Sequence, residues 1–173
     1  MDIKGDYTFN AAIDPVWALL MDTTTIAGCI PGCRALRPVG DDRFEADLVV
    51  VVAAVTGTYD ATIAMEDKKP PHSYALVVDA NGRRGFLRGR AVIELVEHEG
   101  KTVVHVSASG EIGGTVARVG QRMLQGAGRM MMDRFFKCLR RKVSPEIAAE
   151  ADAAAQVPAL DQDPDVPFTP DFE

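Results

Sequence analysis

A long amphipathic pattern near the end of the sequence limits the folds that this chain can adopt. Between residues 115 and 143 the spacing of apolar side chains predicts a helix of about 28 residues, about 42 Å long, with one apolar face. That face consists of Val116, Val119, Met123, Ala127, Met131, Phe135 and Cys138. Two interpretations stay open: the face packs as core on a sheet, or, with the glycines and methionines around it, it roofs an apolar cavity.

Seven strand-like runs precede this helix, and short turns join most of them. Alternation of apolar and polar residues predicts strands over 3–11, 35–39, 44–52, 56–65, 74–79, 85–96 and 102–111. Two short helices are expected after the first strand, one capped by Asp14 with Pro15 at its first position, the next capped within 23–25. The fold class is therefore α+β, with a seven-stranded antiparallel curved sheet wrapped on the C-terminal helix.

Composition indicates an ordinary globular domain with an aliphatic interior. The chain has 173 residues, of which 47% are hydrophobic, 25% charged and only 6% aromatic. We find neither a signal-peptide pattern nor a run of about 18 apolar residues, so a secreted or membrane-spanning protein is not expected. The three cysteines have no framework spacing, which favours buried structural thiols in a reducing cytosol. Residues 49–52 are apolar on both faces, so a partner or a second copy could cover that strand, and a homodimer stays open.

Charge divides the chain at residue 143. Residues 144–173 hold eight acidic residues, five of the ten prolines and no lysine, arginine or glycine. We therefore predict a domain over 1–143 and a disordered acidic tail over 144–173. One alternative for the tail is a short docking segment at 166–172, which contains two phenylalanines.

The outer face of the predicted helix is cationic. It carries Arg118, Arg122, Arg129, Arg134, Lys137, Arg140 and Arg141. Such a face is either simply solvated or meets an anionic surface, for which a membrane leaflet, an acidic partner and the chain's own tail are the candidates. Nucleic acid is not expected as a partner, because the isoelectric point is about 5.1 and no aromatic residues alternate with the bases.

Signals for catalysis or metal binding are weak. The sequence lacks the phosphate-binding, zinc-protease and nucleophile-elbow motifs. Cys29 and Cys33 have no second ligand pair near them, and the three histidines are not spaced to orient a nucleophile. We therefore predict no catalytic residue, no metal and no covalently bound cofactor, and expect the protein not to be an enzyme.

Several segments resemble one family of the helix-grip (SRPBCC) superfamily, which includes START, polyketide-cyclase and birch-pollen-allergen proteins. The chain resembles the CoxG family of carbon monoxide dehydrogenase proteins over residues 1–142. The likeness is carried by Asp14-Pro15-Val16-Trp17-Ala18-Leu19-Leu20, Cys29-Ile30-Pro31-Gly32-Cys33, Pro70-Pro71-His72-Ser73-Tyr74, Gly85-Phe86-Leu87-Arg88-Gly89, Ile112-Gly113-Gly114 and Phe135-Phe136.

The resemblance implies a non-catalytic accessory protein of a molybdenum hydroxylase of the aerobic carbon monoxide dehydrogenase type. Such proteins are thought to recruit the enzyme to the inner face of the cytoplasmic membrane, and they have been linked to quinone binding. The resemblance thus implies a cytoplasmic, peripheral membrane location. A helix-grip cyclase or dehydratase, and an assembly or docking factor without a ligand, are the alternatives.

The cavity of such a fold would be lined from sheet and helices, and we expect it to suit an isoprenoid quinone. The segment 29–33 with its two short helices is the expected gate. The expected lining is Trp17, Leu20, Ile26, Ile30, Tyr59, Ile63, Leu76, Leu87, Ile93, Met123, Ala127, Met131 and Phe135.

Overall fold

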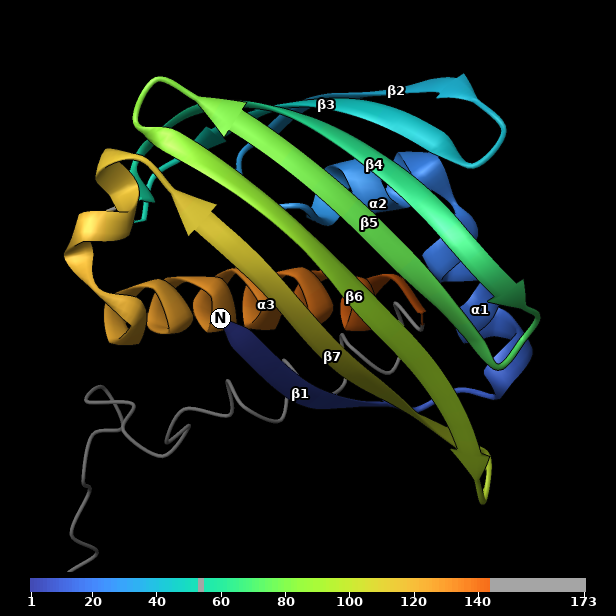
Figure 1. Cartoon of the computed structure of the whole chain (residues 1–173). Coiled ribbons are helices and arrows are strands. Elements are labelled where there is room, and N and C mark those ends of the chain that lie inside the picture. The colour runs from blue at the N-terminus through green and yellow to red at the C-terminus, as the bar shows by residue number, and fades with distance from the viewer. Residues whose placement is uncertain (53–54, 144–173) are drawn as a thin grey trace, which may run out of the picture.

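A single curved sheet wraps around one long helix in the computed structural model, which describes residues 1–52 and 55–143 (Figure 1). The helices are α1 (Ile13–Met21), α2 (Thr23–Cys29), the 3-10 helix η2 (Thr115–Val119) and α3 (Gln121–Val143). The strands are β1 (Asp2–Phe9), β2 (Cys33–Gly40), β3 (Arg43–Val50), β4 (Gly57–Lys69), β5 (Ser73–Gly82), β6 (Gly85–His98) and β7 (Lys101–Gly113). The predicted fold class is confirmed.

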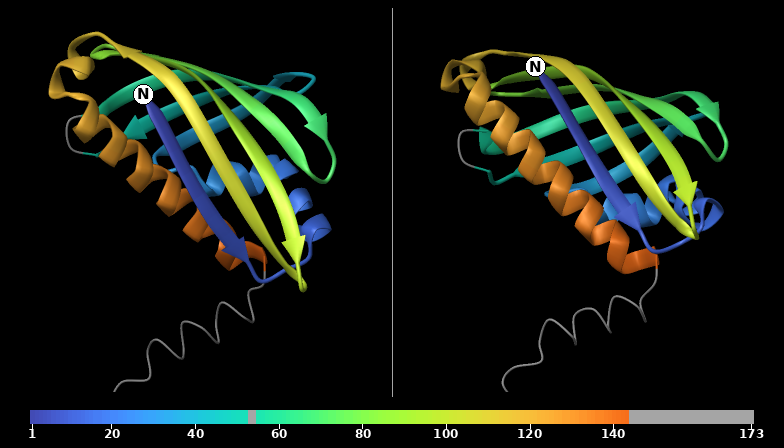
Figure 2. Two further views of the ribbon diagram at one scale, coloured as in Figure 1. Left: turned by 60° about the horizontal axis from the view of Figure 1, so that its bottom comes forward. Right: turned by 90° about the horizontal axis from the view of Figure 1, so that it is seen from below.

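The strand order explains how the sheet grips the helix. All neighbours are antiparallel, and the order is β1-β7-β6-β5-β4-β3-β2, so the first strand closes the sheet beside the last. Figure 2 shows α3 lying along β1 and across the concave side of the sheet. One end of the sheet therefore holds η2 and the start of α3, whereas α1 lies toward the other end (Figure 1).

The helix starts differ from the sequence prediction. The N-cap of α1 is Ala12, which makes no side-chain capping bond, and Asp14 lies within the first turn. The cap of α2 is Asp22, whose carboxylate accepts hydrogen bonds from the amides of Thr24 and Thr25 at 3.1 and 3.5 Å. A carboxylate two or three residues before the free amides satisfies donors that the helix itself leaves unpaired, so the aspartate caps α2 in place of the threonines.

The predicted helix over 115–143 is in fact two elements. Gly120 has a φ of 93°, which ends η2 and lets α3 begin at Gln121. Such a φ is unfavourable for residues with a side chain, and the glycine makes the break inexpensive. The break sets the rotation of α3, so that Leu124 is buried and Met123, predicted on the inner face, is 55% exposed.

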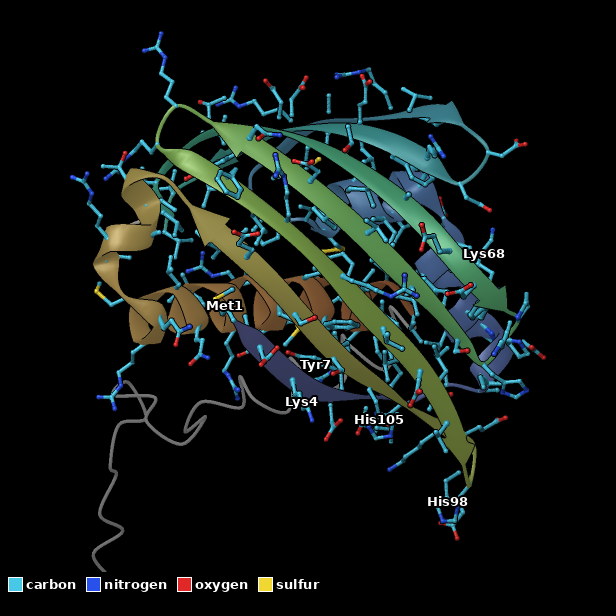
Figure 3. All side chains as sticks on the ribbon, in the orientation of Figure 1. Met1, Lys4, Tyr7, Lys68, His98 and His105 are labelled. Atoms are coloured by element: carbon cyan, nitrogen blue, oxygen red, sulfur yellow. A yellow bond between two sulfur atoms is a disulfide. The ribbon has the colours of Figure 1, made fainter. Side chains whose placement is uncertain are left out.

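The main hydrophobic core lies under the C-terminal half of α3. Phe136 stacks on Tyr7 of β1 with ring centroids 4.1 Å apart, and Leu139 is fully buried beside them. The Tyr7 hydroxyl donates a 2.6 Å hydrogen bond to Asp133 and so joins β1 to α3 (Figure 3). Burial and this bond raise the pKa of Tyr7, which keeps the hydroxyl protonated as a donor.

The cysteine prediction is wrong for two of the three residues. Cys29 at the end of α2 and Cys138 on α3 form a disulfide with a Cα–Cα distance of 5.4 Å. They are 109 residues apart in sequence, so spacing along the chain carries no signal of their contact. Only the packing of α2 on α3 brings them together. Cys33 remains a thiol, and burial raises its pKa.

Two glycines of α3 give a matched test of its packing. Gly126 is exposed, and an added methyl group would meet nothing within 4 Å, whereas a methyl group at Gly128 would lie 2.5 Å from Ile3 Cδ1. Glycine inside a helix costs about 1 kcal/mol relative to alanine. We therefore expect Gly126→Ala to raise the free energy of unfolding by about 1 kcal/mol, and Gly128→Ala to lose that gain by displacing Ile3. Urea titrations measure both, and equal shifts would contradict the close contact.

Burial of Tyr74 predicts a loss of stability in alkali. Its ring lies edge-on to Trp17, 5.5 Å between centroids, and burial raises its pKa well above 10. Above about pH 10 the unfolded chain releases this proton while the folded chain keeps it, so the free energy of unfolding falls by about 1.4 kcal/mol per pH unit. Tyr74→Phe keeps the ring and removes the proton. We expect its urea midpoint to fall less steeply above pH 10, and a slope equal to that of the wild type would refute this origin.

Candidate functional site

An apolar cavity of about 160 Å³ lies between the sheet and the N-terminal half of α3. Strands β3 to β7, η2, α3 and the residues at both ends of that region all contribute to its wall. The lining residues are Met1, Leu48, Val50, Val55, Tyr59, Ala80, Phe86, Leu87, Ile112, Val116, Leu124, Ala127, Gly128 and Met131. It is close in size to a cavity known to hold one benzene molecule, about 150 Å³.

Small side chains on both walls create this space. Ala80 on the sheet belongs to a row in which Ala46, Ala61 and Ala80 are paired across β3, β4 and β5. The helix presents Ala127 and Gly128 to the same volume. Because large side chains are missing from both walls, the sheet and helix leave a void here, whereas Phe136 and Leu139 fill the space further along α3.

Tyr59 supplies the one hydroxyl among the lining side chains. Its O–H donates to the backbone oxygen of Val55 at 2.9 Å, so it is already engaged. The ring lies over Gly82 on the neighbouring strand, where a Cβ would come within 2.8 Å of the ring. None of the fourteen lining residues has an acidic or basic side chain. The wall is therefore suited to apolar contact and has no side chain that could move a proton at neutral pH.

Four of the thirteen predicted lining residues come together in this cavity: Tyr59, Leu87, Ala127 and Met131. Leu20 and Ile93 are buried in the main core instead. Trp17, Ile26, Leu76 and Phe135 pack against that same core, and Ile63 packs against the alanine row. Ile30 ends α2 and is half-buried.

The segment predicted as a gate is not part of the cavity wall. Neither α2 nor residues 29–33 contribute a lining residue. Sequence reasoning overlooked the residues around the other end, of which Val55, Phe86, Ile112 and Val116 are examples. Glycines at 82, 85, 113 and 114 mark the turns there and were an available signal.

A second candidate site is the outer face of η2 and α3. We call the seven exposed cations Arg118, Arg122, Arg129, Arg134, Lys137, Arg140 and Arg141 the basic surface. Within residues 1–52 and 55–143, none of them forms an ion pair. Arg140 lies over the Tyr7 ring at 5.7 Å, and Asp133 is the one acid of α3. The surface is thus strongly positive and uncompensated in the described chain.

The titratable side chains of the same part of the chain are scattered over its surface. Among the described residues, no three acidic, histidine or cysteine side chains converge on a point where a metal could bind. His98 lies at the β6–β7 turn, and His105 points outward from β7 with Nδ1 2.6 Å from Asp6 Oδ1 (Figure 3). Over those residues, no helix combines the length and apolar character that crossing a bilayer requires. The predicted acidic tail lies outside the described residues.

The curved sheet, the long helix and the enclosed apolar cavity define a helix-grip protein, and solved structures of that class share this fold. A conserved protein from Geobacillus kaustophilus is 37% identical, with a TM-score of 0.81 over 83% of this chain and 95% of that chain. A START superfamily protein from Mycobacterium smegmatis is 11% identical, with a TM-score of 0.65 over 82% and 96%. The Zhui aromatase/cyclase from Streptomyces sp. R1128 is 14% identical, with a TM-score of 0.59 over 83% and 93%. No curated protein sequence matches significantly.

Residues 5–144 match the family model of the carbon monoxide dehydrogenase protein CoxG. The chain belongs to the CoxG family. Membership suggests an accessory role to carbon monoxide dehydrogenase, and members of this family are generally non-catalytic.

Proposed function

We propose that this protein is a non-catalytic accessory protein of a molybdenum hydroxylase of the carbon monoxide dehydrogenase type. It binds a hydrophobic ligand, a respiratory quinone, in the cavity under α3 and recruits the enzyme to the cytoplasmic face of the membrane. The observation that carries the proposal is the apolar cavity itself, whose fourteen lining residues include no acid or base. Family membership supports the choice of partner enzyme.

The size of the cavity limits how a quinone is held. A volume of about 160 Å³ is below the roughly 300–1,000 Å³ of usual ligand sites and fits one substituted ring. The ring therefore enters the space between Ala80 and Ala127, and an isoprenoid chain extends outside it. The sequence-based expectation of a cavity long enough for the chain is replaced by this ring-only mode.

The basic surface supports the membrane part of the proposal. Cations close to an anionic leaflet contribute about 1 kcal/mol each, and seven exposed cations lie on η2 and α3. Arg118 and Arg122 lie at the same end of the molecule as the cavity-lining Val116 and Leu124. This proximity would bring the cavity close to the bilayer, from which a lipophilic quinone is obtained.

Mass spectrometry and lipid binding test the two parts separately. Native mass spectrometry with organic extraction of protein from a quinone-containing host should show one quinone per chain. Vesicles containing about one-third anionic lipid should retain the protein at low salt and release it at 0.5 M salt. If no lipophile co-purifies and tetramethyl-1,4-benzoquinone is not taken up, the ligand role is wrong and a docking factor without a ligand replaces it.

A further inference from the structure

The basic surface carries two exposed methionines that membrane lipid alone does not explain. Met123 is 55% and Met130 is 44% exposed, and each follows an arginine. Seven residues span almost two helical turns, so both side chains lie on the same side of α3. Methionine is an adaptable apolar surface that binds aromatic rings well. The surface therefore combines positive charge with two apolar contact points.

The complementary chemistry is acidic with a few aromatic side chains. Within the described residues, the basic surface has no ion-pair partner, and the single acid of α3, Asp133, accepts the Tyr7 hydroxyl at 2.6 Å. Residues 144–173 carry eight acids and no base, and they contain Phe168 and Phe172. This segment follows Val143, the last residue of α3, directly in sequence.

The segment is long enough to reach the whole surface. Met123 lies about 30 Å back along the helix from Val143, at about 1.5 Å per residue. The 25 residues from 144 to 168 span at most about 80 Å when extended, and about 25–30 Å as a coil. A tether of this length gives an effective concentration near the millimolar range. A contact with an intrinsic dissociation constant of about 0.1 mM would then be formed about 90% of the time.

We propose that residues 144–173 dock on the basic surface of their own domain. The tail carboxylates pair with the arginines and lysines, and Phe168 and Phe172 contact Met123 and Met130. The docked tail occupies the face that would meet an anionic membrane, so it acts as a built-in competitor. That last consequence rests on the proposed membrane function, whereas the docking itself does not.

Methyl-labelled methionines in the full-length chain test the docking. The tail variant is Asp161→Asn/Asp163→Asn/Asp165→Asn, and the aromatic variant is Phe168→Ala/Phe172→Ala. The matched control removes three exposed body carboxylates that form no described ion pair, through Asp41→Asn/Glu94→Gln/Glu97→Gln. We expect the Met123 and Met130 methyl resonances to shift in the first two variants and to stay in the control. The Met65 resonance on β4 should stay in all three.

Salt and vesicles complete the test. At 0.5 M salt the tail variant and the wild type should give the same methyl resonances, because screening releases the acidic contacts. Unchanged Met123 and Met130 resonances in both tail variants at low salt would overturn the docking. On anionic vesicles the tail variant should bind about tenfold tighter than wild type or control. Equal binding would overturn the competition, and no vesicle binding by any variant would overturn the membrane function while the methyl resonances still decide the docking.

Discussion

Ala127→Leu should abolish ligand binding while leaving the protein folded. Ala127 packs with Val50, Val52 and Met131 around the cavity, and leucine adds three carbon atoms to a space of about 160 Å³. A close-packed wall has no room for both the new side chain and a ring, so affinity for tetramethyl-1,4-benzoquinone should fall at least about 100-fold. The Met131 methyl resonance reports ring binding directly. This quinone is fully substituted and therefore does not add to the Cys33 thiol.

The control variant adds the same side chain to the other side of the helix. Gly126→Leu places leucine next to Ala127 in sequence, at a position where an added Cβ meets nothing within 4 Å. Its affinity should equal that of the wild type. Filling the cavity should also raise the free energy of unfolding of Ala127→Leu by about 1 kcal/mol. If Ala127→Leu binds the ring as tightly as the wild type, the ligand does not occupy this cavity.

Loss of the Cys29–Cys138 bond should be the largest single stability change in the domain. A disulfide between residues 109 apart restricts the unfolded chain strongly, and removing one of this span costs about 4–5 kcal/mol. The double variant Cys29→Ala/Cys138→Ala in a Cys33→Ser background should therefore unfold at a much lower urea concentration than Cys33→Ser alone. The Cys33→Ser background prevents exchange with the third thiol.

Reduction provides an independent measurement of the same bond. Cys29 is only 4% exposed, so the reductant must be applied to the unfolded chain before refolding. Reduced Cys33→Ser protein should match the double variant, and the double variant should not respond to reductant. A urea midpoint that is the same with and without reductant would show that the bond does not hold α2 on α3 in solution.

The fold was predictable because its signals are local. Alternation along β4 to β7 and the three-or-four spacing of α3 both follow from which face of an element is buried. The break at Gly120 was missed because apolar spacing continues through it, from Val116 and Val119 to Met123. The glycine was the available signal, and its positive φ is what separates η2 from α3.

The site was less predictable because it depends on what faces what. A cavity exists where small residues on the sheet meet small residues on the helix, and sequence alone does not say that Ala80 lies opposite Ala127. The prediction instead used large apolar residues such as Trp17 and Phe135, which pack in the core because they fill space. The same limitation hid the disulfide, whose two cysteines meet only when α2 lies on α3.

The two halves of α3 give it the mechanics of a cantilever. Its C-terminal half is clamped by Phe136, Leu139 and the bond to Cys29, whereas its N-terminal half spans a void and begins at the Gly120 break. The free end carries Arg122 and Met123 on its outside and the cavity roof on its inside. A load applied to the outer face near this end would bend the beam where it is least supported. Contact with a surface and opening of the space beneath would then be one movement.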